Sequence, residues 1–566
     1  MRTGFIVSFL FIGLMSAAQP VYPKGYFRNP LDIPMQLVAN FGELRSNHWH
    51  MGLDIRTQQR ENLVVHAAAA GFISRIKIEP FGFGRAIYIQ HPNGYTTLYA
   101  HLNDFAPALE KWVREQQYQV GSWDVTLTVP ANLFPVEKGQ FIAYSGTTGG
   151  SQGPHVHFEI RDTKTENCLN PLLFGMPIAD AVPPTLTRLA MYDRNKSIYA
   201  QAPQILPVSK TNSGYILAKS NLLKVGSNKI SFAIGAIDRF TGSGNGNGIF
   251  SARILMDGQL QSEFILDNIS YNETRYSNAQ IDYRFKYNGG GYVQQLSRMP
   301  GDFSKVYIPS STDGILYLQD SLPHTVRIEI KDAAQNISVL QFSVQYNSKL
   351  YPLQVAAAAN RLIPGNVTIY ETSSFEAYTT EYAVYDTVNV SYSVNTGTGT
   401  NNISPLHTFI GPTIPLHDQL TVRIKPDANV PLNLKDKVVI VSTSGTRKSV
   451  SKARWSGDWV WATFNQFGTY QALIDDEPPT INAPGAGDTI DLRKATRIVM
   501  APKDNLNEIR SFRATLDGQW LRFTNDKGSL FIYKFDEKFL PGVHELKVVV
   551  ADVAGNVTTK SWFVRR

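Results

Sequence analysis

The stretch GPHVHFEI, residues 153–160, predicts a β-strand, because Phe158 and Ile160 alternate with Glu159. Residues i and i+2 of a strand point to the same face, so His155 and His157 should project side by side. Such a pair can supply a metal ligand and an adjacent base, or it can be two polar residues on a solvent face. The pair alone leaves both interpretations open.

A second stretch rich in metal-binding residues is HWHMGLDI, residues 48–55. On a straight strand, His50 and Asp54 would share a face but lie roughly 13 Å apart, too far to bind one zinc ion. A bend is needed, and Gly52 lies between them, where a bend costs least. We therefore favour His50 with Asp54 as ligands over the rival pair His48 and His50.

A β-hairpin is predicted in IYIQHPNGYTTLYAHL, residues 87–102, because apolar residues alternate on both sides of Asn93-Gly94. His101 should lie on the polar face of the downstream strand. His91 in the turn and His66 in an apolar run are expected to be structural.

Three motifs in order carry a resemblance to the lysostaphin-type (LytM-like) zinc metallopeptidases, which cut peptides in bacterial peptidoglycan. They are HMGLD at 50–54, YAHL at 99–102 and GPHVHFEI at 153–160. EKGQFIAYSGTTG at 137–149 and NPLLFG at 170–175 also match the family pattern. The resemblance implies an antiparallel β catalytic domain.

The resemblance also implies a site. His50, Asp54 and His157 would bind one zinc ion and leave a position for the attacking water, as catalytic zinc sites do. His155 would be the general base, and His101 would hydrogen bond to the water or to the developing oxyanion. If the two catalytic histidines titrate near the reference pKa of about 6.5, activity should fall below that pH.

Two features depart from the family pattern. The segment 103–136 is longer than usual, so known cleavage preferences do not transfer; within it, FAPALEKWVREQQ at 105–117 predicts a helix with Pro107 near its start. Arg85 stands where Asn is common. It could contact a substrate carboxylate, but we favour an exposed hairpin residue.

The rest of the chain predicts β-sandwiches, so the fold class is all-β. Short alternating runs rich in Thr, Val, Asn and Tyr begin near residue 176. We expect a signal peptide at 1–18, the peptidase domain at 19–175, an immunoglobulin-like sandwich with an insertion at 176–347, a β-rich domain at 348–474, and a second immunoglobulin-like sandwich at 475–566.

An internal repeat supports this division. PPT occurs at 183–185 and 478–480, ARILMDGQ at 252–259 parallels FRATLDGQ at 512–519, and LPHTVRIEIKDAAQN at 322–336 parallels LPGVHELKVVVADVAGN at 540–556. The Asp-x-Ala-x-Asn stretch should form the turn into the last strand. The first copy is longer, through the loop TGSGNGNG at 241–248 and the stretch 261–310.

The N-terminus predicts export. Arg2 precedes an apolar run from Phe5 to Met15 and the small residues 16–18, the pattern of a signal peptide cleaved after Ala18. The run is too short to be a comfortable membrane anchor, and no later segment predicts a transmembrane helix. The expected location is the periplasm or cell envelope of a bacterium. The single cysteine, Cys168, allows no internal disulfide.

The net charge is +7, but the sequence has no dense run of Lys and Arg. We therefore expect peptidoglycan peptides, and not nucleic acid, as partners. The leading hypothesis is a secreted zinc endopeptidase. The alternatives are a catalytically silent activator of a cell-wall amidase, or a surface adhesin whose β modules bind a wall or envelope protein partner. If the first holds, residues 19–175 alone should cleave.

Overall fold

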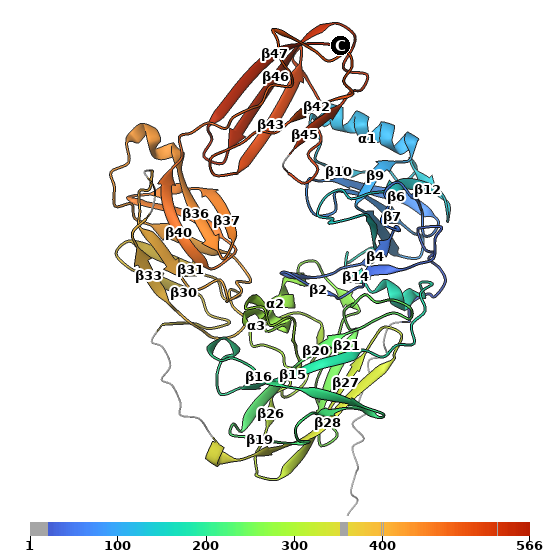
Figure 1. Ribbon diagram of the computed structural model, residues 1–566, viewed down its shortest axis with the longest axis vertical. Coiled ribbons are helices and arrows are strands. Elements are labelled where there is room, and N and C mark those ends of the chain that lie inside the picture. The colour runs from blue at the N-terminus through green and yellow to red at the C-terminus, as the bar shows by residue number, and fades with distance from the viewer. Residues whose placement is uncertain (1–20, 351–359, 398, 400, 529) are drawn as a thin grey trace, which may run out of the picture.

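The computed structural model describes residues 21–350, 360–397, 399, 401–528 and 530–566. The predicted signal peptide lies outside the described residues. Strands dominate along the chain, and the all-β prediction is confirmed. The ribbon forms an open ring in which the C-terminal strands return to the N-terminal part (Figure 1).

The N-terminal part is built on one large antiparallel sheet. Its main path runs β1 (Leu37–Ala39), β4 (Leu53–Arg56), β13 (His155–Asp162), β8 (Tyr95–Ala100), β7 (Arg85–Gln90), β6 (Gly71–Ile78) and β10 (Val125–Thr128). A smaller sheet, β5 (Val64–His66), β12 (Phe141–Ser145) and β9 (Leu102–Phe105), packs with it. The apolar alternation of β4 and β13 fills the core between them.

The predicted hairpin is present as β7 and β8, and Gly94 takes a φ of 85° in its turn. The polar side chains of β8 lie inside the protein. Thr97 and Tyr99 are fully buried, and their hydroxyl groups bond to one another, to His91 and to the Ala68 N–H.

The predicted helix is α1 (Pro107–Val120). Pro107 occupies its first turn, where the missing N–H costs nothing, and Gly121 ends it with a left-handed φ of 69°. Leu109 and Val113 face the core. The helix therefore packs its apolar face on the core of the N-terminal part.

The second part is a sandwich of two sheets. One holds β16 (Gln204–Leu206), β15 (Thr185–Asp193), β20 (Lys229–Ile237) and β24 (Gln294–Gln295), with β26 (Leu316–Tyr317) also paired to β20. The other holds β17 (Val208–Thr211), β18 (Gly214–Leu217), β28 (Ile337–Tyr346), β27 (Pro323–Lys331), β21 (Ser251–Met256), β22 (Gln259–Ile265) and β25 (Tyr307–Ile308), with β19 (Leu222–Val225) beside β28. Phe232 and Phe342 pack between the sheets with ring centroids 5.4 Å apart.

The third part is also two-layered. Its sheets are β30 (Thr368–Glu371), β31 (Phe375–Thr379), β35 (Leu420–Ile424), β39 (Trp459–Phe464) and β38 (Arg454–Ser456), and β33 (Tyr392–Asn395), β34 (Leu406–Phe409), β40 (Gly468–Ile474), β36 (Val438–Ser444) and β37 (Arg447–Lys452).

The last part holds β41 (Thr489–Asp491), β47 (Val557–Arg565), β46 (Val543–Asp552), β43 (Ile509–Leu516) and β44 (Gln519–Trp520), with β42 (Arg497–Met500) paired to β45 (Phe531–Lys534). As predicted, the Asp-x-Ala-x-Asn stretches form the turns that lead into β28 and β47.

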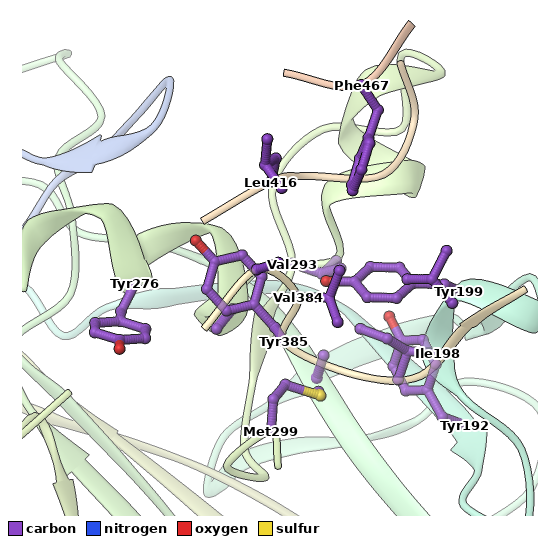
Figure 2. Close-up of a cluster of buried hydrophobic side chains, with 14 of the residues drawn as sticks. Tyr192, Ile198, Tyr199, Tyr276, Val293, Met299, Val384, Tyr385, Leu416 and Phe467 are labelled. Atoms are coloured by element: carbon purple, nitrogen blue, oxygen red, sulfur yellow. The ribbon is translucent and has the colours of Figure 1, made fainter. Parts of the chain in front are cut away.

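The second and third parts share one apolar core. Figure 2 shows side chains of both parts meeting there, among them Tyr199, Tyr276, Met299, Tyr385 and Leu416. The Tyr385 hydroxyl donates to the Arg275 carbonyl oxygen at 3.0 Å. The two parts are therefore fastened by buried apolar surface as well as by the chain.

The last part closes the ring against α1 (Figure 1). The Tyr118 hydroxyl donates to Asp536 at 2.6 Å, and the Tyr118 ring packs edge-on against Trp520. Farther along, Lys527 donates to the Ser151 carbonyl oxygen at 2.9 Å. Within the described residues, no helix combines the length and apolar character that a membrane crossing requires.

Candidate metal centre

The strand register brings the predicted ligands together. β13 lies between β4 and β8, so His157 is directly opposite Asp54 on one side and Ala100 on the other. His101 follows β8 directly, and its φ of 59° turns the chain there. Three motifs that are far apart in the sequence thus meet at one point of one sheet.

The segment between His50 and Asp54 bends, as their spacing requires. β3 (His48–Trp49) ends before His50 and β4 begins at Leu53. Gly52 serves mainly a close approach: a Cβ at this position would lie 2.5 Å from the Phe158 carbonyl oxygen. The rival residue His48 is exposed and bonds to the Ser46 carbonyl oxygen, outside this group.

Three donor atoms converge where the motifs meet. The Oδ1 atom of Asp54 lies 2.9 Å from Nε2 of His50 and 2.9 Å from Nδ1 of His157. The two nitrogens are 3.0 Å apart, and all three side chains are buried. Two imidazoles and one carboxylate are a donor set that suits zinc.

The outer hydrogen bonds fix which histidine nitrogens carry protons. Nδ1 of His50 lies 2.7 Å from the Asn40 carbonyl oxygen, which can only accept, so Nδ1 donates and Nε2 keeps a lone pair. Nε2 of His157 lies 2.9 Å from Oε1 of Glu159, so its Nδ1 keeps a lone pair. Two lone pairs and a carboxylate oxygen therefore face one another, an arrangement that a cation stabilises.

The charges around this point favour a cation. Burial opposes charge on His157, but its hydrogen bonds to Asp54 and Glu159 prevail and raise its pKa to about 9. Without a metal ion Nδ1 of His157 therefore carries a proton, and its lone pair becomes available when metal binding releases that proton. Burial is likewise outweighed at Asp54, whose pKa is held well below its usual range by His50 and by hydrogen bonds to His155 and His157. The second oxygen of Asp54 accepts from Arg45 at 3.1 Å.

The two predicted catalytic histidines lie beside the donor atoms. Their rings are 4.7 Å apart, and Nε2 of His155 is 3.3 Å from Oδ1 of Asp54. Nδ1 of His155 donates to the Gly153 carbonyl oxygen, and Nδ1 of His101 donates to that of Thr148. Each histidine therefore has an Nε2 lone pair available.

His101 differs from the expectation in its protonation. Burial, with repulsion from His155 and His157, lowers the pKa of His101 to about 3. The expectation that His101 takes up a proton near pH 6.5 is therefore wrong. It is a neutral hydrogen-bond partner across the physiological range.

Glu159 anchors the back of the site. Besides His157, it accepts from Arg161 at 2.6 Å and from the hydroxyl of Tyr271, a residue of the second part. Burial alone would raise the pKa of Glu159, but Arg161 and His157 lower it to about 2. This carboxylate therefore stays ionised and holds the imidazole of His157 in place.

Two insertions of the second part reach this site. β23 (Asn268–Ile269), in the predicted insertion 261–310, pairs with β14 (Cys168–Leu169) and brings Tyr271 to Glu159. In the loop 241–248, Gly248 exchanges hydrogen bonds with the Asn40 side chain. Both ligand histidines are thus supported from outside the N-terminal part.

Sequence reasoning missed four supporting residues: Asn40, Arg45, Glu159 and Tyr271. Glu159 lies inside a quoted motif, where its place two residues after His157 was the available signal. Tyr271 carries no such signal, because its contact spans more than a hundred residues and depends on how the parts pack.

Other predicted positions have structural contacts. His91 bonds to Ala70 and Thr97, and His66 bonds to Gly139, as structural histidines do. The prediction of an exposed Arg85 is wrong. Its side chain is buried, paired with Glu110 and placed over the Phe105 ring, so it ties the hairpin to α1.

One family profile matches the part of the chain that holds the first two of these motifs. The profile of peptidase family M23 matches residues 48–124, and that of the Zu5-like domain matches residues 361–475. A solved zinc-containing peptidase from Vibrio cholerae is 25% identical, covering 24% of this chain and 37% of that one, with a TM-score of 0.18.

Curated relatives match over 128 to 160 residues. The DD-carboxypeptidase/endopeptidase Mpg of Neisseria meningitidis serogroup B is 32% identical over 128 residues, 23% of each chain. A metalloprotease of Haemophilus influenzae is 28% identical over 160 residues, 27% of this chain and 28% of its own. The matches span about a quarter of these relatives. The N-terminal part of this chain thus contains a domain of peptidase family M23.

Proposed function

We propose that this chain is an exported zinc metalloendopeptidase that hydrolyses peptide crosslinks of bacterial peptidoglycan. The observation that carries the proposal is the meeting of two histidine lone pairs and one ionised carboxylate oxygen within 3.0 Å of one another. Three protein ligands, in place of four, leave room for water, which is typical of catalytic zinc sites.

In this proposal His50, Asp54 and His157 hold one zinc ion. The ion would lower the pKa of a water molecule and polarise the scissile carbonyl group. Arg45 holds the second oxygen of Asp54, so that carboxylate would offer a single ligand atom. Asn40 and Glu159 keep both imidazoles in the tautomer that ligation needs.

The proton transfers fall to His155. Its Nε2 lone pair faces the site, so it can take the proton of the attacking water and pass it to the leaving amine. The Nδ1–H bond to the Gly153 carbonyl oxygen orients the ring. His101, which is neutral, would accept a hydrogen bond from the water through Nε2 and hold it in position.

The substrate class rests on the relatives. One is named for DD-carboxypeptidase and endopeptidase activity, and another is a cell division protein of Caulobacter vibrioides, DipM, 28% identical over 142 residues. We expect the bond between D-Ala and diaminopimelate to be cleaved, with a glycine-containing bridge as the other candidate. The signal peptide 1–18 would direct the chain to the periplasm or envelope.

The remaining β modules complete the proposed organisation: a peptidase domain at 19–175, immunoglobulin-like sandwiches at 176–347 and 475–566, and a β-rich domain at 348–474 between them. Tyr271 and Gly248 contact Glu159 and Asn40, which hold the ligand histidines. The first sandwich would therefore support the metal site, in addition to acting as a spacer. An envelope protein partner would have to use the outer faces of these modules.

The test is muropeptide mass spectrometry on purified peptidoglycan digested with the zinc-loaded chain. New peptide ends should appear with the wild type and not with His157→Ala, which should also lose bound zinc. His155→Ala should keep zinc and lose about 10²- to 10⁴-fold in turnover. Normal turnover in His155→Ala would refute its role as base.

The same experiment separates the alternatives. An amidase activator would produce no peptide ends itself but would increase amidase cleavage, with or without His157. An adhesin would bind the wall and leave it intact. Either outcome, with zinc bound stoichiometrically by the wild type, would overturn the proposed endopeptidase activity.

A further inference from the structure

The two sandwiches that carry the internal repeat each gather three aspartates at one point. The groups are Asp180, Asp238 and Asp332 in the second part, and Asp475, Asp504 and Asp552 in the last part. Within each group, one carboxylate oxygen per residue lies within 4.8 Å of the other two.

The two groups occupy equivalent places in the repeat. Asp180 and Asp475 lie in the linkers that lead to the Pro-Pro-Thr stretches. Asp332 and Asp552 open the Asp-x-Ala-x-Asn turns, directly before the last strands. The same chemistry has thus been built twice from sequence segments that are far apart.

An asparagine braces each group in the same way. The side-chain nitrogen of Asn336 donates to Asp332 at 2.8 Å and to the Asp180 carbonyl oxygen at 3.3 Å. Asn556 donates to Asp552 at 2.8 Å and to the Asp475 carbonyl oxygen at 2.8 Å. These bonds hold the linker against the turn and leave the carboxylate oxygens facing one another.

In each group a buried aspartate keeps one carboxylate oxygen without a hydrogen-bond partner among the described residues. Asp238 and Asp475 are each only 1% exposed, yet Oδ1 of Asp238 and Oδ2 of Asp475 have no hydrogen-bond partner among the described residues. Within the residues that the structure describes, none of the six aspartates forms a salt bridge with Lys or Arg. Burying an unpaired carboxylate is costly, so each group calls for a cation.

We propose that each aspartate group binds one calcium ion. All the donors are oxygens, the ligands that hard cations prefer, whereas zinc favours nitrogen and sulfur. Oxygens bound to one calcium ion lie no farther apart than about twice the Ca–O distance of about 2.4 Å, and the carboxylate oxygens of each group lie within 4.8 Å of one another. Magnesium usually keeps several waters and binds through one or two carboxylates, whereas three carboxylates meet here.

The ions would act at the junctions between parts. Asp180 lies in the linker after the peptidase part, and Asp238 pairs with Asn247 at the base of the loop that holds Asn40. Asp475 directly follows β40 of the third part. Calcium would therefore stiffen both linkers, a role separate from the proposed hydrolysis.

The test is calcium titration of the chelator-stripped full chain by isothermal calorimetry. The wild type should bind two calcium ions, and Asp238→Asn and Asp475→Asn should bind one each. The double variant should bind none. Asp476→Asn is the matched control, because Asp476 is exposed beside Asp475 and lies outside the group, and it should still bind two.

Thermal unfolding distinguishes a metal site from a merely structural carboxylate. In chelator, Asp238→Asn should keep or raise the Tm, because it removes a repelling charge. In calcium, its Tm should fall below that of the wild type. The proposal is overturned if the wild type binds no calcium up to about 10 mM, above the range of weak extracellular modules. It is also overturned if both variants still bind two ions.

Discussion

Tyr271 shows at the residue scale how a distant side chain can support the candidate metal centre. Its hydroxyl donates to the carboxylate that orients His157, and its ring lies under Arg161 at 4.9 Å. Partners of this kind commonly set metal affinity, because they fix the tautomer and the angle of the ligand.

Replacing Tyr271 by Phe should weaken zinc binding by about tenfold without unfolding the chain, because one donor to Glu159 is lost and the ring is kept. Competition with a zinc chelator measures the affinity, and circular dichroism verifies the fold. Tyr317→Phe, at an exposed tyrosine, is the control. Equal zinc affinity in Tyr271→Phe and the wild type would show that the hydrogen bond from Tyr271 to Glu159 does not contribute to zinc binding.

His407 gives the third part a specific acid sensitivity. It is fully buried against Phe375, and burial lowers its pKa from 6.5 to about 4. The unfolded chain binds the proton more readily than the folded one. The contribution of this histidine is therefore complete above pH 6.5 and is lost as the pH falls toward 4.

His407→Gln should therefore flatten the loss of Tm between pH 7 and pH 4.5, whatever its effect on Tm at neutral pH. Thermal melts across this range give the slope. His324→Gln is the opposite control, since the hydrogen bond with Asp257 raises the pKa of His324 and stabilises the fold at acid pH. An unchanged slope in His407→Gln would contradict the assignment.

At the scale of elements, the bend at residues 50–52 packs against β13 and so brings the side chains of the candidate metal centre together. On a straight strand the Cα atoms of His50 and Asp54 would lie roughly 13 Å apart. The bend brings their side chains together, with Nε2 of His50 at hydrogen-bond distance from Oδ1 of Asp54. Gly52 permits it by lying where a side chain would meet the backbone of β13.

Gly52→Ala should push the bend away from β13 and abolish stoichiometric zinc binding, because the blocking atom is a backbone oxygen that cannot move aside. Metal analysis of the purified variant measures this. Gly153→Ala, also beside the site but with nothing within 4 Å of the added Cβ, should bind zinc normally. Full zinc occupancy in Gly52→Ala would mean that the close approach is dispensable.

At the scale of the whole molecule, some apolar side chains of the N-terminal part are buried against the second part and not in its own core. Phe41, Trp49, Met51 and Cys168 belong to the apolar cluster of the second part. The indole N–H of Trp49 donates to Gln280 at 2.8 Å. An isolated N-terminal fragment would expose this surface and lose the supports of both ligand histidines.

Residues 19–175 are therefore expected to be too short for full activity, and efficient cleavage should need a fragment that includes the first sandwich. We expect 19–175 to have a lower Tm and weaker zinc binding than 19–347, and 19–347 to cleave like the full chain. Melting curves, zinc titration and muropeptide analysis on the two fragments check this. Equal behaviour of both fragments would show that the first sandwich supports nothing at the site.

The sequence by itself determined the fold class, the hairpin and helix α1, and its resemblance to the LytM-like peptidases named the five residues that the structure brings together at the candidate site. These follow from local alternation, from Gly94 and Pro107, and from motifs that lie on neighbouring strands. Such signals are readable because they depend on residues only a few positions apart.

Only the tertiary structure decided the rest. The support of the ligands by Asn40 and Tyr271, the burial of Arg85, and the meeting of the aspartates all join segments that are far apart in the chain. The Asp-x-Ala-x-Asn motif predicts a turn, but its partners in the linker and in the segments after β20 and β42 become visible only when the sheets pack together. Side-chain burial and pKa depend on this closure, because packing excludes water from each group.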